Sequence, residues 1–388
     1  MKNWKILLAL LTANVVLMSS ASTMLVPFLP IYLIRELGVS PDRVHLWNGA
    51  IFSVTFLISS IMVPFWGNLA DKKGKRMMAL RSSIGLVIAY FAAGLARTPE
   101  QMFAARVIQG FASGLSTMCL AIASGLLPSD ELGVGLGILQ SGFTCGTIVG
   151  PLLGSFLSTY LGMRASYFAA GILLSIVTLA IFFFIPEPPK HKTPKSAITR
   201  KALLQRPVIR DTLIYVAVIQ IGIFLIQPVL SLHIAELNKG AGKLLFISGL
   251  VFSFAGVAGA ITAPLWGCFG QRRGFQNALV LALLLSGVTS ILNAVPESLL
   301  LFCFTNFAYA LCRAGIQPSL SAMLASNTEQ EHQGRVFGYM FAAQQFGSMA
   351  GPLLGGLMAG IFTLRYLFIF GGAAMLAISA CAWLRRYE

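Results

Sequence analysis

Long apolar runs separated by short polar segments dominate this chain. A helix needs roughly 20 apolar residues to cross the hydrocarbon core of a bilayer. Twelve runs are long enough, and they predict membrane-spanning helices over residues 6–34, 46–70, 78–96, 101–127, 133–161, 164–185, 208–235, 244–269, 275–294, 298–325, 336–362 and 366–384. The pattern therefore indicates an all-α integral membrane protein.

The composition agrees with this pattern and excludes an ordinary soluble protein. Of the 388 residues, 56% are hydrophobic and only 11% are charged, whereas a typical soluble domain carries about 25% charged residues. Twelve spans use most of the chain, so we expect no large domain outside the membrane.

The first run has one alternative explanation. Lys2 and Lys5, the apolar run that follows them and the small residues at 19–22 resemble a secretory signal peptide. The apolar run continues through Pro27 and Pro30, however, which makes it too long for a signal sequence. We expect this segment to remain as the first span.

The basic residues give the orientation, because Lys and Arg concentrate on the cytoplasmic side of membrane proteins. One side receives the N-terminus, the central loop and Lys72, Lys73, Lys75, Arg76, Arg81, Arg272, Arg273, Arg335, Arg385 and Arg386. The other side has only Arg35, Arg43, Arg97, Arg164, Lys239, Lys243 and Arg365. We expect a multi-pass protein of the cytoplasmic (inner) membrane with both termini in the cytoplasm. The net charge of +15 then reflects topology and attraction to anionic lipid, and no nucleic-acid partner is expected.

The two halves of the sequence repeat each other. Pro64-Phe65-Trp66-Gly67 returns 200 positions later as Pro264-Leu265-Trp266-Gly267. Gly150-Pro151-Leu152-Leu153-Gly154 returns 201 positions later as Gly351-Pro352-Leu353-Leu354-Gly355. The displacement of 201 also relates Pro27 to Pro228, Gly146 to Gly347 and Arg164 to Arg365. Such a register is the signature of an internal duplication.

The repeat predicts the domain organisation. Residues 1–186 and 208–388 form two six-helix bundles, joined by a basic, Pro-rich cytoplasmic linker at 187–207. Both bundles have the same orientation, so they form a parallel repeat. In transporters, repeats of this kind hold a substrate near the membrane midplane and expose it to the two sides in turn.

Four motifs resemble those of the major facilitator superfamily, and within it the twelve-span drug:proton antiporters. The segment 67–76 is similar to the superfamily motif between spans two and three, and 106–110 is similar to its Arg-x2-Gln-Gly motif. The glycines of span five and Pro27-Phe28-Leu29-Pro30 resemble motifs of the drug-efflux branch. The resemblance implies the major facilitator fold of twelve transmembrane helices in two bundles, and export of small molecules.

The motif at 67–76 also has a physical interpretation. Gly67 and Gly74 with a basic cluster make a tight cytoplasmic turn, and Asp71 can cap a neighbouring helix N-terminus. The resemblance assigns Asp71, together with Gly67, Gly74 and Arg76, to a latch between conformations. The alternative is a plain turn that obeys the positive-inside rule, which explains the basic residues but not the carboxylate.

The glycines of span five share one helix face. Gly142, Gly146, Gly150 and Gly154 recur at four-residue spacing, so another helix can approach this face closely. Pro151 is expected to kink the helix, because it cannot donate to the backbone ladder. The resemblance makes these residues a conformational hinge that seals the two halves together; packing alone is the simpler alternative.

Arg106 and Arg313 are the charged residues predicted to lie well inside spans. An arginine at the bilayer centre costs at least roughly 2.5–3.5 kcal/mol, so such residues usually face a polar cavity. The resemblance gives Arg106 a role in substrate or proton handling. The repeat maps Arg106 to Phe307, so Arg313 has no equivalent in the first half. Contacts to helix carbonyls, or snorkelling, are the structural alternatives for both.

The sequence predicts no acidic residue in the middle of spans one, four, seven or ten. Proton-driven members of the family commonly carry one there, so proton coupling is inherited from the resemblance alone. The remaining candidates for carrying a proton are Glu36, Asp71, His233 and Glu236.

A cavity with arginine and without carboxylates favours anionic, zwitterionic or neutral amphipathic cargo, because a buried charge needs a partner. Amides and aromatic side chains can form an adaptable binding surface. The candidate substrate-binding residues are Asn14, Arg106, Gln109, Gln140, Gln220, Gln227, Tyr309, Arg313, Gln317, Phe341 and Gln344. Each amide taken alone is equally well explained as a hydrogen bond between helices.

Other classes of function have little support. The chain contains no HExxH, CxxC, GxSxG or P-loop motif, and its six cysteines are scattered singly, so we expect neither an enzyme nor a bound metal or cofactor. The leading hypothesis is a proton-coupled exporter of small amphipathic compounds, acting as a monomer with substrate, protons and lipid as partners. The alternative is a dedicated exporter of an anionic metabolite such as a carboxylate siderophore.

Overall fold

The computed structural model describes residues 4–128, 131–188, 205–227, 230–238 and 244–385, apart from the side chains of Asp71, Gln330 and Glu331. Most of the predicted linker, 187–207, lies outside the described residues. All regular secondary structure in the described part is helical, which confirms the predicted all-α class.

The first half of the sequence forms eight helices. They are α1 (Trp4–Thr23), α2 (Leu29–Arg35), α3 (Pro41–Lys73), α4 (Lys75–Leu95), α5 (Pro99–Ala112), α6 (Leu115–Leu126), α7 (Leu132–Tyr160) and α8 (Met163–Phe184). The described part of the second half also forms eight. They are α10 (Pro207–Ile226), α11 (Leu230–Leu237), α12 (Leu244–Arg273), α13 (Phe275–Leu292), α14 (Leu299–Arg313), α15 (Ile316–Ser326), α16 (Gln330–Ala359) and α17 (Leu364–Leu384).

Eleven of the described helical segments are long and apolar enough to cross a membrane. The remaining predicted span, 336–362, corresponds to α16, a helix of 30 residues. Its polar N-terminal turns and its Gln344-Gln345 pair lower its hydropathy relative to the others. Every span predicted from the apolar runs therefore lies on one helix or on a pair of helices.

Spans one, four, seven and ten are each built from two helices, which the apolar pattern did not predict. The pairs are α1 with α2, α5 with α6, α10 with α11, and α14 with α15. Between α5 and α6, Gly114 adopts φ +110°, a conformation that favours glycine because it has no Cβ. In span one, Pro30 occupies the first turn of α2, where a missing N–H costs nothing. Hydropathy does not respond to such local breaks.

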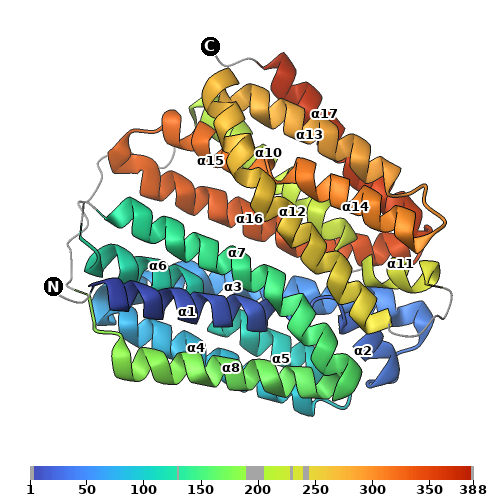
Figure 1. Ribbon diagram of the computed structural model, residues 1–388, viewed down its shortest axis with the longest axis horizontal. Coiled ribbons are helices and arrows are strands. Elements are labelled where there is room, and N and C mark those ends of the chain that lie inside the picture. Colours follow the sequence, from blue (N-terminus) through green and yellow to red (C-terminus); the bar gives the residue numbers. More distant parts are fainter. Residues whose placement is uncertain (1–3, 129–130, 189–204, 228–229, 239–243, 386–388) are drawn as a thin grey trace. The chain divides into compact units, whose positions relative to one another are not determined.

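The chain divides into two compact units. Unit 1 holds 1–41, 54–193 and 243–253, and unit 2 holds 42–53, 194–242 and 254–388. In unit 1, α1 packs along α7 and α4 along α8; in unit 2, α10 packs along α16 and α13 along α17 (Figure 1). The same pairs recur in both units, as the sequence repeat requires.

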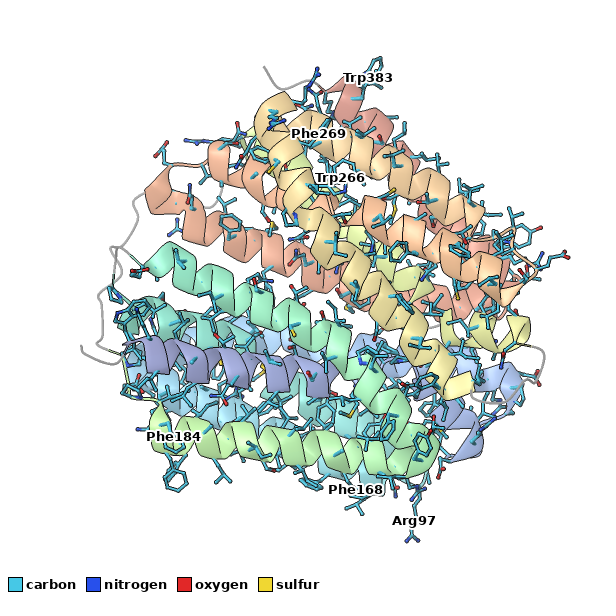
Figure 2. The ribbon with its side chains drawn as sticks, viewed as in Figure 1. Arg97, Phe168, Phe184, Trp266, Phe269 and Trp383 are labelled. Carbon is cyan, nitrogen blue, oxygen red and sulfur yellow. The ribbon has the colours of Figure 1, made fainter. Side chains whose placement is uncertain are left out.

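Large apolar side chains cover the outer faces of the helices. Phe184 and Trp383 are 64% and 56% exposed and point away from their helices in Figure 2. In a soluble protein such a surface would be unfavourable, whereas hydrocarbon chains solvate it well. The exposure pattern is therefore that of a lipid-facing surface.

Candidate transport site

Arg106 lies at the centre of a buried polar cluster in unit 1. It is only 9% exposed, and its Nη1 donates to Oε1 of Gln109 at 2.9 Å. Gln109 in turn donates to the hydroxyl of Tyr90 at 3.5 Å, and the Tyr167 hydroxyl lies within electrostatic reach of the guanidinium. The cluster brings together two of the predicted substrate-binding residues.

The charge of Arg106 has no anionic partner among the described residues. None of the described ion pairs includes it, and its buried Nε has no hydrogen-bond partner. Asn14, on α1 of the same unit, is 2% exposed and likewise has an unpaired Nδ2. Unit 1 thus contains unused donors and a positive charge, which is a suitable environment for an anionic or hydrogen-bond-accepting group.

The helix caps correct the repeat register around Arg106. Thr98 and Ser298, 200 positions apart, cap α5 and α14 with their side chains. This displacement places Arg106 opposite Asn306, a buried polar residue, and not opposite Phe307 as the displacement of 201 predicted. The two displacements differ because the register of the repeat changes from 200 to 201 positions within this span, close to the helix break.

Trp66 and Arg81 stabilise the break between α5 and α6. The indole Nε1 of Trp66 donates to the Phe111 carbonyl at 2.9 Å, and Arg81 donates to the carbonyls of Phe111 and Ser113, each at 3.1 Å. The Arg81 guanidinium also lies 3.8 Å from the centre of the Trp66 ring. Carbonyls left open by the end of α5 are therefore satisfied by two other helices.

Arg81, one of the basic residues predicted on the cytoplasmic side, lies within α4 and not before it. α4 begins at Lys75, so Arg81 lies about 9 Å along the helix at 1.5 Å rise per residue. The sequence did not predict that Arg81 contacts the end of α5, because this contact joins two different helices.

Unit 2 has the same tryptophan contact, but its arginine comes from a different position. Trp266 Nε1 donates to the Leu311 carbonyl at 2.9 Å, 200 positions after the equivalent pair. Arg313 is the last residue of α14, where a cation interacts favourably with the helix dipole, and it lies 5.8 Å from the centre of the Tyr309 ring. Each helix break therefore has a tryptophan and one nearby arginine, but the two arginines occupy different positions in their units.

The remaining predicted substrate-binding residues are dispersed. Gln220 on α10 donates to Ser348 on α16 at 3.3 Å, so this amide joins two helices. Gln227 lies at the C-terminal end of α10. Gln140 and Gln317 are exposed, whereas Phe341 and Gln344 on α16 are half-buried.

The glycine face of α7 lies against α1. A Cβ built on Gly142 would be 2.8 Å from Thr12, and one built on Gly146 would be 2.5 Å from the Val16 carbonyl oxygen. Gly150 and Gly154 meet α1 and the residue after it in the same way. In unit 2, Gly347, Gly351 and Gly355 of α16 meet α10. The helix expected to approach the span-five face is therefore the first span of the same half.

The turn predicted over 67–76 is confined to Gly74, because α3 continues through Lys73 and includes Gly67, and α4 begins at Lys75. Gly74 adopts φ +111°, and the Glu187 carboxylate accepts hydrogen bonds from the backbone N–H groups of Lys75 and Arg76 at 2.6 and 3.1 Å. The Lys75 ammonium donates to the Ala121 carbonyl at 3.2 Å, and Arg76 donates to carbonyls at the end of α8. A carboxylate does cap a neighbouring helix here, but it is Glu187.

Asp71, the residue expected to provide such a cap, has a side chain outside the described residues. Glu187 was not predicted, since its contact with α4 spans more than a hundred residues. A carboxylate directly after the last apolar residues of a span is the only sequence signal that marks it.

Asp211 is a buried acid that the sequence analysis missed. It lies in the second turn of α10, its side chain is 3% exposed, and it pairs with Arg210 at 2.9 Å and with Arg385. Asp211 lies at the start of span seven and not in its middle, so it adds a buried acid that the prediction about the middle of the spans did not cover. Because its partners include a residue at the far end of the chain, the pair was not visible in the sequence.

Two of the proposed proton carriers have partners of different kinds. Glu36 forms an ion pair with Arg164 at 3.1 Å. Glu236 lies 3.4 Å from Nδ1 of His233, whose side chain is 1% exposed. The first acid faces a permanent cation and the second a titratable one.

A comparison with known families decides what kind of protein this fold forms. The model of the Major Facilitator Superfamily matches residues 11–259 and 213–388. The chain belongs to the major facilitator superfamily. It is 30% identical to the multidrug resistance protein MdtG of Salmonella arizonae over 98% of this chain and 95% of that protein. A second MdtG, from Salmonella heidelberg, is 31% identical over the same extent.

Two solved transporter structures share the fold. The nucleoside transporter NupG has a TM-score of 0.82 at 15% identity, covering 97% of this chain and 99% of NupG. The human organic anion transporter MFSD10 has a TM-score of 0.72 at 20% identity, covering 98% of this chain and 99% of that transporter. This chain is thus a multi-pass membrane transporter of the superfamily, with relatives named for multidrug resistance.

Proposed function

We propose that this protein is a secondary active exporter that moves small amphipathic compounds out of the cytoplasm in exchange for protons, by alternating access. It acts as a monomer in the inner membrane with both termini in the cytoplasm. Full-length similarity to MdtG proteins supports export of varied compounds. The internal repeat supports alternation between two states.

The observation that carries the choice of cargo is the unpaired charge of Arg106. A guanidinium stays protonated in proteins, and a buried charge without a partner is costly. Cargo with an anionic or strongly accepting group supplies that partner, whereas a lipophilic cation is repelled. We therefore propose zwitterionic, anionic and neutral amphipathic substrates.

Efflux from cells tests this proposal. Cells with and without the protein are loaded with zwitterionic norfloxacin, anionic carboxyfluorescein or cationic ethidium, and the retained dye or drug is measured. We expect faster loss of norfloxacin and carboxyfluorescein, and no loss after a protonophore collapses the gradient. Equal retention of all three compounds with and without the protein would contradict export.

A dedicated exporter of one anionic metabolite, such as a carboxylate siderophore, is the second candidate. The absence of a carboxylate partner for Arg106 among the described residues favours it. Thermal-shift measurements separate the two: stabilisation by a single class of organic anion, lost in Arg106→Gln and in Arg313→Ala, supports this candidate. Stabilisation by structurally unrelated compounds supports multidrug export.

A further inference from the structure

Each unit carries a matching cluster of buried rings. In unit 1, Tyr32 of α2 packs against Tyr167 of α8 with ring centres 5.1 Å apart, and the Tyr167 hydroxyl contacts the Met102 sulfur at 3.9 Å. In unit 2, His233 of α11 packs against two phenyl rings at 5.1 and 5.3 Å. Displacements of 200 or 201 relate Tyr32 to His233, Met102 to Phe302 and Tyr167 to Phe368.

The acid beside each cluster has a different partner. Glu36 pairs with Arg164 in unit 1. Glu236 lies 200 positions later, but its ion-pair partner is His233, and Arg365, the equivalent of Arg164, takes part in none of the described ion pairs. A permanent cation in one half is therefore replaced by a group that can gain or lose a proton.

The surroundings of His233 suit a reversible change of charge. Neither ring nitrogen has a hydrogen-bond partner among the described residues, so Nδ1 is free to accept a proton. The Glu236 carboxylate lies 3.4 Å from Nδ1, within ion-pair distance of a protonated ring, and it is 64% exposed, which connects the pair to solvent. The other titratable or charged groups within electrostatic reach in unit 2 are Arg365, which acts on His233, and His45, on which Glu236 acts.

We propose that His233 and Glu236 form the proton-binding site of the transporter, at the end of span seven that faces the outside. The proposal rests on the proposed proton-coupled export. A proton from the external water enters past Glu236, binds Nδ1 of His233 and leaves to the cytoplasmic side later in the cycle. Glu36 does not share this role, because its carboxylate is paired with Arg164, a permanent cation.

Transport by purified protein in liposomes tests the assignment. Norfloxacin and carboxyfluorescein movement is measured with and without an imposed pH gradient, for the wild type, His233→Asn and Glu236→Gln. His233→Tyr is included because tyrosine is the residue found at this place in unit 1, so it keeps a ring in the site. The matched control is His332→Asn, since His332 is 3% exposed and lies 3.6 Å from Glu329 at the same spacing.

We expect the variants at 233 and 236 to lose stimulation by the gradient while downhill movement persists, which also shows that they fold. Infrared titration of the purified protein is expected to lose the coupled histidine and carboxylate change in His233→Asn and to keep it in His332→Asn. Gradient stimulation that survives in both His233 variants overturns the assignment and leaves proton-coupled export standing. A wild type without any gradient stimulation overturns both.

Discussion

The indole nitrogen of Trp66 donates to the carbonyl oxygen of Phe111 at 2.9 Å, and Trp266 makes the same contact with Leu311. Each bond satisfies a carbonyl at the point where a span divides into two helices. The tryptophan of the repeated Pro-x-Trp-Gly segment is thus hydrogen-bonded to a helix break that also occurs in both halves. This link gives the tryptophan a structural reason to occur in both halves.

Replacing this tryptophan has a predicted cost. Trp66→Phe keeps a ring beneath Arg81 but removes the donor, so we expect a loss of about 1 kcal/mol in the free energy of unfolding. Thermal unfolding in detergent measures it. Trp383→Phe is the control, because Trp383 is 56% exposed; an equal loss in the control would count against the cap.

The contact of α7 with α1 leaves no space for side chains. Gly146→Leu places a side chain against the Val16 carbonyl and Ser19, and overpacking of this kind costs about 1–3 kcal/mol or more. We expect poor expression and a lower unfolding temperature. Gly137→Leu on the same helix serves as the control, since nothing lies within 4 Å of its built Cβ. Similar behaviour of both variants would refute the prediction.

Glu187 caps the N-terminus of α4. Glu187→Ala removes the acceptor for two backbone N–H groups, and the loss of an N-terminal cap costs about 0.5–2 kcal/mol. Glu187→Gln keeps one acceptor oxygen and should lose less. Unfolding temperatures in that order confirm the cap. Glu100→Ala, an exposed acid in the first turn of α5, is expected to change stability less than Glu187→Ala.

Asp211 holds two arginines at the start of α10. Asp211→Leu leaves Arg210 and Arg385 without their shared acceptor, at a cost of about 1–3 kcal/mol. The lower part of that range is expected because both arginines are more than half exposed. Asp211→Asn keeps an acceptor and should fall between the wild type and the leucine variant. A leucine variant as stable as the wild type would show that the ion pairs contribute nothing measurable.

The sequence was sufficient for the features that depend on long patterns. Apolar runs located the spans because each span needs many consecutive apolar residues, and the matching helix pairs of the two units follow the repeat. The helix breaks at Gly114 and after Ile226 were not predicted, because hydropathy averages over many residues. Another reason explains why the contacts of Arg81, Glu187 and Asp211 were not predicted. Their partners lie on helices distant in sequence, and only folding brings them together.

The glycine contacts have a mechanical consequence. Where α7 meets α1, the glycines of α7 lie against backbone atoms and short side chains of α1, which leaves no room for a larger side chain and opposes sliding of one helix past the other. The same holds for α10 and α16. Each pair has to travel as a single rod, so any hinge in this transporter must bend somewhere else along the chain.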